Sequence, residues 1–385
     1  MNILNKSKDK YEQYIWRKRL FLAELFVLVV GLAVWSLCTG SSGMKIPDVF
    51  AALLHRGTKQ METSIWNVRM PRTATAIAVG AALALTGCVL QNVLRNPLAS
   101  ASTLGVSQGA SFGAAFAITM LGAGIQVNSG TGGALTITNP YMVSICAFAG
   151  GITTTIVILM LAFFTKATPS TMILAGVALS SLFTGATTLI QYFCDDVVMA
   201  TIVYWTFGSL GRAGWREIGL ISILTLASGL WFYWNRWNYN ALESGHHTAK
   251  SLGVSVDALI VGSMIAGSLI AAVSVAFVGC ISFIGLIAPH MVRKVVGNDH
   301  RYLIPASALG GAAILILADI ASRLLAAPTV LPIGALTSFL GAPLFLYMII
   351  RKGHTYRGSC VSYNSAQHPA RWVRGCVWDR EVVRH

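Results

Sequence analysis

Long apolar stretches alternate with short polar connections along most of this chain. A helix that crosses a bilayer needs about 20 mostly apolar residues, and a helix enclosed by others tolerates fewer. We therefore expect about ten membrane-spanning helices. They lie near residues 20–38, 73–92, 103–122, 141–164, 170–193, 217–235, 257–278, 282–292, 303–322 and 332–350.

Composition points to an all-α, polytopic membrane protein. Hydrophobic residues fill 55% of the 385 positions and charged residues only 11%, whereas a soluble domain carries about 25% charged residues. The net charge of +14 would suggest nucleic acid in a soluble protein. Here Lys and Arg cluster in residues 6–19 and 351–384, and the positive-inside rule explains them as two cytoplasmic ends. We expect a multi-pass protein of the cytoplasmic (inner) cell membrane with no nucleic-acid partner.

The same pattern divides the chain into three parts. Residues 1–19 form a cytoplasmic N-terminal segment, and residues 20–352 form the transmembrane domain. The apolar run after residue 19 is long and lacks an A-x-A-like cleavage site, so it is expected to be an uncleaved first span. Residues 353–385 form a polar, basic tail without apolar periodicity, which we expect to be disordered.

One short motif has the form of a catalytic site. Residues Gly105 to Gly109 fit the G-x-S-x-G pattern around a nucleophilic serine, Ser107. That pattern acts in a strand–turn–helix setting, whereas here it opens an apolar helix. With Gly113, the spacing is typical of close helix packing, so Gly105, Gly109 and Gly113 are assigned to packing and no catalytic residue is expected. An intramembrane hydrolase that uses Ser107 is the alternative.

Polar chemistry inside the predicted spans is sparse. The seven cysteines form no C-x-x-C or Cys/His cluster, so we expect no metal site and no cofactor bound by this chain. The acids Glu24 and Asp319 lie close to the ends of their spans. A carrier driven by an ion gradient usually needs acids at mid-depth, so the energy is expected to come from elsewhere, with such a carrier as the rival hypothesis.

Two polar regions are candidate contact surfaces. Residues 236–257 form the longest polar interval between the first span and the tail, with two short helical pieces and small residues at their bends. This interval is either a docking surface for a soluble partner or an ordinary solvated loop. Arg69, Arg72 and Arg323 stand at the outer ends of their spans, where they either form a positive rim for an acidic partner or extend toward lipid headgroups. Asp319 lies one helical turn before Arg323 and is placed to pair with it.

A series of motifs, by order and spacing, resembles the membrane subunit of the ABC importers for iron–siderophores, haem and cobalamin. The resemblance runs from about Arg69 to Lys352. The motifs are Arg69-Met-Pro-Arg-Thr, Gly80-Ala-Ala-Leu-Ala-Leu-Thr-Gly87, Arg95-Asn-Pro-Leu-Ala99, Leu104-Gly-Val-Ser-Gln-Gly-Ala110, Leu174-Ala-Gly-Val-Ala178, Leu252-Gly-Val254, Ile281-Ser-Phe-Ile-Gly-Leu-Ile-Ala-Pro-His290, Asp299-His-Arg301, Leu317-Ala-Asp319 and Leu331-Pro-Ile-Gly334.

The resemblance implies a permease subunit in a homodimer or paired with a second permease, two cytoplasmic ATPase subunits, and an extracellular or periplasmic solute-binding protein. ATP and Mg²⁺ would bind the ATPase partners, so this chain is not expected to be an enzyme. Transport would proceed by alternating access, with an iron–siderophore-type chelate as the expected cargo and haem or cobalamin as alternatives. The matching positions are Arg69, Arg72 and Arg323 for binding-protein docking; Leu242, Gly245, His246, Ala249, Leu252 and Gly253 for ATPase coupling; and Ser170, Thr171, Leu174, Ala178, Leu331, Pro332 and Gly334 for the pathway lining.

Two positions depart from the family's pattern. His246 follows Gly245 where the family usually has an acid, and it stands next to a second titratable group, His247. Val330 replaces the acid that usually precedes Leu331. The first departure changes the charge of the expected ATPase contact, and the second changes that of the outer rim.

Overall fold

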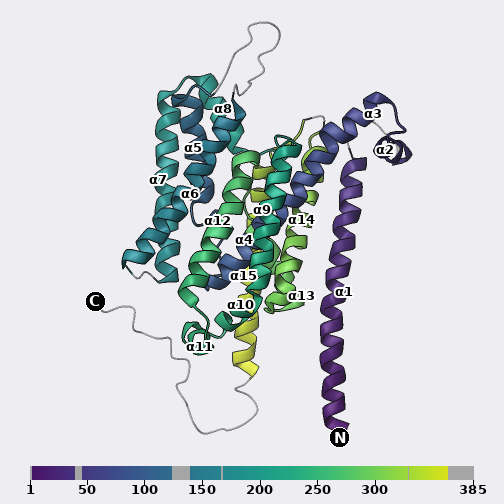
Figure 1. Ribbon diagram of the computed structural model, residues 1–385, viewed down its shortest axis with the longest axis vertical. Coiled ribbons are helices and arrows are strands. Elements are labelled where there is room, and N and C mark those ends of the chain that lie inside the picture. Colours follow the sequence, from purple (N-terminus) through teal and green to yellow (C-terminus); the bar gives the residue numbers. More distant parts are fainter. Residues whose placement is uncertain (1, 40–45, 124–138, 166–167, 328, 363–385) are drawn as a thin grey trace. The chain divides into compact units, whose positions relative to one another are not determined.

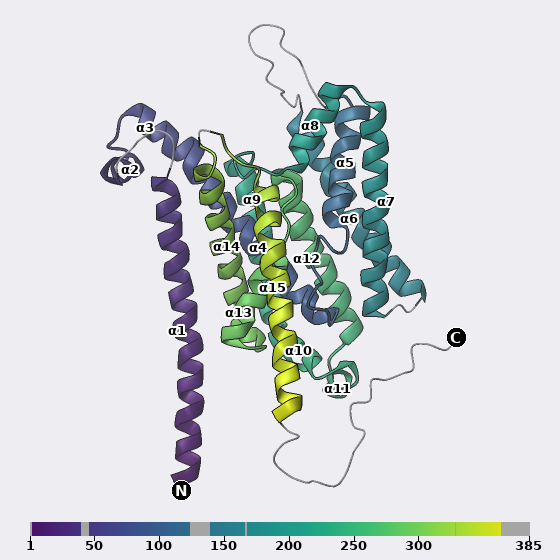
Figure 2. The same cartoon turned by 180° about the vertical axis from the view of Figure 1, so that it is seen from behind.

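The computed structural model describes residues 2–39, 46–123, 139–165, 168–327 and 329–362, and in this part of the chain every regular element is a helix (Figures 1 and 2). Each predicted span coincides with a helix. These helices are α1 (Asn2–Cys38), α4 (Met70–Val93), α5 (Val106–Met120), α6 (Pro140–Thr165), α7 (Pro169–Phe193), α9 (Trp215–Trp234), α12 (Val256–Val278), α13 (Ile284–Val296), α14 (His300–Leu324) and α15 (Ile333–Ser362). The others are short: α2 (Ile46–Leu53), α3 (Lys59–Ser64), the π-helix η1 (Ile65–Arg69), α8 (Asp196–Thr206), α10 (Arg236–Glu243) and α11 (His246–Ser251).

Within the described residues, 7 helices are long and apolar enough to cross a membrane. The chain is therefore a polytopic helical membrane protein, as its composition predicts. α5 and α13 have only 15 and 13 residues, too few to cross a bilayer without enclosure by other helices. The total of about ten spans and the cytoplasmic position of both ends stay predictions.

The chain divides into two units, residues 1–341 and residues 342–385. The first unit holds the helices up to the beginning of α15. The second holds the remainder of α15, which extends to Ser362. The tail that we expected to be disordered from residue 353 therefore begins within a helix, and residues 363–385 lie outside the described residues.

α4 is the central helix of the first unit and contacts α9, α12, α13 and α14. Glycines let the backbones touch. A Cβ added to Gly80 would lie 2.5 Å from the carbonyl oxygen of Gly311 in α14, and Gly87 meets Gly285 of α13 in the same way. Because protein interiors are close-packed, a larger residue at either position would force the helices apart.

α5, α6 and α7 pack together, and α5 and α6 also contact α12 (Figure 1). Gly109 and Gly113 lie against the α6 backbone around Gly150, which is the close approach that their spacing predicts. Gly105 differs from them because it precedes α5 in a left-handed conformation (φ 84°) and packs against Gly176 of α7.

Candidate functional site

α10 and α11 form the two short helical pieces expected in the long polar loop. They lie at the end of the bundle where α1 begins, opposite α3 and α8 (Figures 1 and 2). Gly245 (φ 114°) separates the two helices, and Gly253 (φ 83°) follows the second. Both φ values fall where only glycine is comfortable, so these two positions are turns that a side chain would strain.

Buried side chains anchor α10 and α11 to the bundle. Tyr239 and Leu242 of α10 and Ala249 of α11 are fully buried. The Tyr239 hydroxyl lies 2.9 Å from Oγ of Ser263 in α12. Asn92, near the end of α4, donates through Nδ2 to the Tyr239 carbonyl oxygen at 3.3 Å. Displacement of α10 would therefore disturb both α4 and α12.

A polar network fixes α10 to the turn before α14. Asn240 Nδ2 donates to Asp299 Oδ1 at 3.0 Å, and the His300 backbone N–H donates to Asn240 Oδ1 at 2.8 Å. Arg301 Nη2 donates to Asp299 Oδ2 at 2.8 Å, and its guanidinium lies 4.9 Å from the centre of the Trp237 ring. Burial tends to raise the pKa of Asp299, but hydrogen bonds from Arg301 and Asn240 outweigh it and lower the pKa to about 2. The carboxylate is therefore charged at neutral pH.

The outer side of α11 carries groups that are open to a partner. His247 and Lys250 are exposed, and Leu252 is 66% exposed. Burial, with the nearby Arg95 charge, lowers the pKa of His246 below its ordinary value, so this ring is neutral near pH 7. A cleft of about 810 Å³ lies beside it, lined by Leu94, Arg95, Pro169, Ser170 and residues 244–248. The predicted coupling residues thus divide into buried anchors, glycine turns and exposed contact groups.

The three outer arginines come together, but inside the protein. Arg72 Nε donates to Asp319 Oδ1 at 2.6 Å, and Arg323 Nη2 lies 2.8 Å from Asp319 Oδ2 in an ion pair with poor hydrogen-bond geometry. Arg323 Nη1 and Arg69 Nη1 donate to carbonyl oxygens at the end of α1, at 2.8 and 2.7 Å. Arg69 is 5% exposed, and the side chains of Arg72 and Arg323 are 15% and 11% exposed. Arg69 and Arg323 thus hold the end of α1, and Arg72 joins α4 to α14. Docking of a binding protein at these arginines stays a prediction.

The predicted pathway residues fall on two different surfaces. Ser170, Thr171, Leu174 and Ala178 are all exposed on α7, and only 11% of the most apolar stretch of this helix is buried. Such a face needs lipid or another subunit to cover it.

The residues at the start of α15 are more enclosed. Leu331, Pro332 and Gly334 are half-buried. The Gly334 backbone N–H donates to the Phe207 carbonyl oxygen at 3.0 Å, and a Cβ on Gly334 would lie 2.7 Å from that same oxygen. These contacts make Gly334 a packing position that joins the start of α15 to the end of α8.

A family model described as the FecCD transport family matches residues 27–351. The chain belongs to the FecCD family. A Methanocaldococcus jannaschii relative, named as ABC transporter permease protein MJ0087, is 48% identical to this FecCD chain over 343 residues, which cover 89% of it and 97% of the relative. The hemin transport system permease protein HmuU of Yersinia pestis is 34% identical over 335 residues (87% and 96%). The vitamin B12 import system permease protein BtuC of Escherichia coli is 36% identical over 337 residues (86% and 94%).

Solved structures share the FecCD fold. A metal-chelate type ABC transporter in an inward-facing conformation matches with a TM-score of 0.73 and 31% identity, over 86% of this chain and 98% of that one. PsaBC from Streptococcus pneumoniae matches with a TM-score of 0.51 and 17% identity, which shows a common fold alone. The family resemblance inferred from the motifs is confirmed, and the chain is an importer permease of the FecCD family.

Proposed function

We propose that this FecCD-family chain is the membrane subunit of an ATP-driven importer that carries a metal chelate of the iron–siderophore type into the cytoplasm. The observation that supports it most directly is the anchoring of α10 and α11. Through Tyr239 and Asn240, α10 bonds to α4, to α12 and to the turn before α14. A push from a soluble partner at this surface would reach the central helix, whereas an ordinary solvated loop needs no such anchors.

The ATPase subunits would dock on the exposed side of α11. Arg236, Lys250, Arg293 and Lys294 lie in the elements at this end of the bundle, so the positive-inside rule makes it cytoplasmic. His247, Lys250 and Leu252 supply the contact groups. ATP and Mg²⁺ belong to the partner subunits, and Gly245 and Gly253 act as the bends about which α11 moves.

A second permease copy would cover the exposed face of α7. In a homodimer this face lines a pathway between the copies, with Ser170, Thr171, Leu174 and Ala178 along its wall. The solute-binding protein would dock at the opposite end of the bundle. Because Arg69, Arg72 and Arg323 are largely enclosed, the exposed cations Arg56, Lys59 and Arg216 are better placed to meet its acidic groups.

Haem and cobalamin are the alternative cargoes, since HmuU and BtuC are named for them. The hydrolase hypothesis finds no support at Ser107. Its side chain is buried, and it stands in the first turn of α5, not in the strand–turn–helix setting in which the motif acts.

Reconstitution tests the proposal. The chain is placed in liposomes with its ATPase and solute-binding partners, and uptake of a labelled iron–siderophore, haem and cobalamin is measured in parallel. We expect uptake of the siderophore that requires ATP, stops with vanadate and survives an uncoupler. Uptake by this chain alone, or uptake driven by an ion gradient, would overturn the importer; preference for haem or cobalamin would change only the cargo.

A further inference from the structure

A cavity of two adjacent chambers lies between α6, α9 and α12, apart from the surfaces described above. The inner chamber has a volume of about 310 Å³ and apolar walls, among them Ile145, Leu224 and Val273. The outer chamber has a volume of about 230 Å³, and the charged residues Arg212 and Glu217 stand among its otherwise mostly apolar walls. The two chambers share the lining residues Tyr141, Ser144 and Phe277. The cavity is thus apolar at one end and carries two charged side chains at the other.

Arg212 is the cation of the outer chamber. Its two terminal nitrogens face the carbonyl oxygens of Trp205 and Tyr204 at 3.5 and 3.4 Å, which is long for hydrogen bonds. Among the residues that the structure describes, no carboxylate forms an ion pair with Arg212. The guanidinium therefore has donors to spare for an anion.

Glu217 lines the same chamber, but its oxygens are already engaged. Oε1 accepts a hydrogen bond from the Tyr141 hydroxyl at 3.0 Å, and Oε2 accepts one from the Gly214 backbone N–H at 2.8 Å. The first bond ties the beginning of α6 to α9, and the second caps the beginning of α9. Glu217 thus shapes the chamber mouth and leaves Arg212 as the group available to a ligand.

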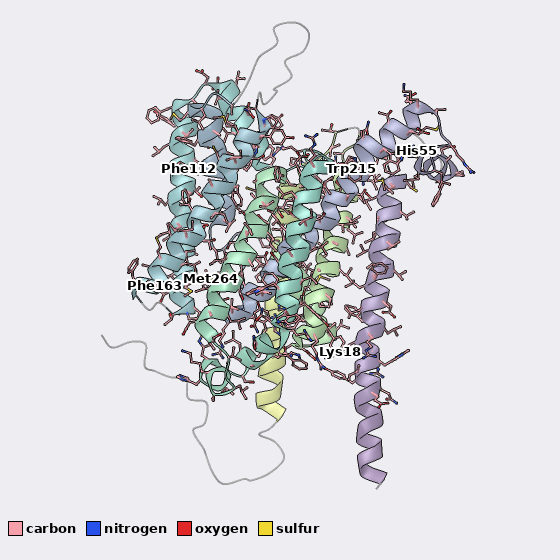
Figure 3. All side chains as sticks on the ribbon, viewed as in Figure 1. Lys18, His55, Phe112, Phe163, Trp215 and Met264 are labelled. Carbon is pink, nitrogen blue, oxygen red and sulfur yellow. The ribbon has the colours of Figure 1, made fainter. Side chains whose placement is uncertain are left out.

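The position of the cavity along the helices fits the edge of a bilayer. Tyr141 and Trp215 stand in the first turns of α6 and α9, and Figure 3 shows Trp215 at this end of the bundle. Tyr and Trp gather at membrane–water interfaces. From Tyr141 to Phe148 the helix rises about 10 Å, so the inner chamber extends from this interface into the hydrocarbon layer.

We propose that this cavity binds a membrane glycerophospholipid, with its phosphate at Arg212 and one acyl chain in the inner chamber. Bilayer hydrocarbon is as apolar as the chamber wall, so the chain alone gains nothing by entering. The preference must come from the headgroup. A phosphate accepts charge-assisted hydrogen bonds in the fork geometry of a guanidinium, which a neutral diacylglycerol cannot do.

Native mass spectrometry of the full chain tests this site. The detergent-purified protein is mixed with equal amounts of phosphatidylglycerol and diacylglycerol that carry the same acyl chains. We expect wild type to retain phosphatidylglycerol and Arg212→Gln to retain at least about tenfold less. Arg216→Gln is the matched control, because Arg216 is exposed on the same segment and does not line the chamber. Leu224→Trp fills the inner chamber and is expected to lower retention with Arg212 intact.

Three results would overturn the proposal. They are equal retention by wild type and Arg212→Gln with both proteins folded, equal retention of diacylglycerol and phosphatidylglycerol, and displacement of the lipid by inorganic phosphate alone. The last would mark a simple anion site without an acyl-chain contribution. A melting curve for each variant separates lost binding from lost folding.

Discussion

Replacement of Asp319 by Asn should destabilise the protein through the two arginines that it leaves behind. Asp319 is fully buried between Arg72 and Arg323, whose side chains are 15% and 11% exposed. The Asn side chain keeps the shape but removes the charge, and it sets an NH₂ group or a neutral oxygen against two guanidinium donors. Removal of one partner from a buried ion pair costs about 3–5 kcal/mol, and so little exposure leaves little screening by solvent.

A thermal-shift measurement on the purified protein in detergent checks this estimate. On the scale known for mid-sized domains, the loss corresponds to a fall in melting temperature on the order of 10 °C. Asp257→Asn is the control, because its pair with Lys250 at 3.3 Å is mostly exposed and exposed pairs contribute about 0–1 kcal/mol. If Asp319→Asn has the same melting temperature as Asp257→Asn, the charge of Asp319 does not stabilise the two arginines.

The remaining predictions concern the end of the bundle that carries α10 and α11. Gly245→Val forces a side chain into a backbone conformation that costs about 1–3 kcal/mol, so the amount of cargo taken up per ATP hydrolysed should fall while the ATPase stays bound. Gly219→Val is the control, because no atom lies within 4 Å of its added Cβ. Unchanged uptake per ATP in Gly245→Val would contradict the turn assignment. Leu252→Asp should weaken co-purification of the ATPase by about tenfold or more without changing the melting temperature, and normal co-purification would place the contact elsewhere. Because the pKa of Asp299 is lowered from 3.8 to about 2, its stabilising contribution is complete above pH 3.8 and is lost as the pH falls toward 2. The melting temperature of wild type should therefore fall faster over that range than that of Asp299→Asn, and parallel curves would count against the Arg301 and Asn240 bonds.

The sequence pattern was sufficient to locate the long helices but not the short helix α8. Hydropathy located every long helix because the bilayer requires a sustained apolar run. α8 (Asp196–Thr206) was missed because its 11 residues are too few for a span and carry no marked period. Asp195 precedes α8 and Asp196 stands in its first turn; acids at these positions are local signs that a helix begins there.

The arginine cluster shows what one-dimensional spacing leaves out. The Asp319–Arg323 pair lies within one helical turn and was predicted. The Arg72–Asp319 bond joins residues 247 positions apart, and the bonds of Arg69 and Arg323 end on backbone carbonyls of α1. Every residue has a backbone carbonyl oxygen, so the residue types in a sequence do not indicate which carbonyl an arginine will bond. For α10 and α11, by contrast, glycines at the two bends were a local signal, and the structure places turns there.

The contact between Gly80 and Gly311 limits how the protein is able to move. Two helices that pack through side chains can slide past each other, because the side chains change rotamer and repack. Here the backbones themselves touch, and a side chain brought to the position of Gly80 would meet the carbonyl oxygen of Gly311. In the proposed transport cycle, α4 and α14 would therefore move as a single piece, and α7 and the bends around α11 would take up the motion.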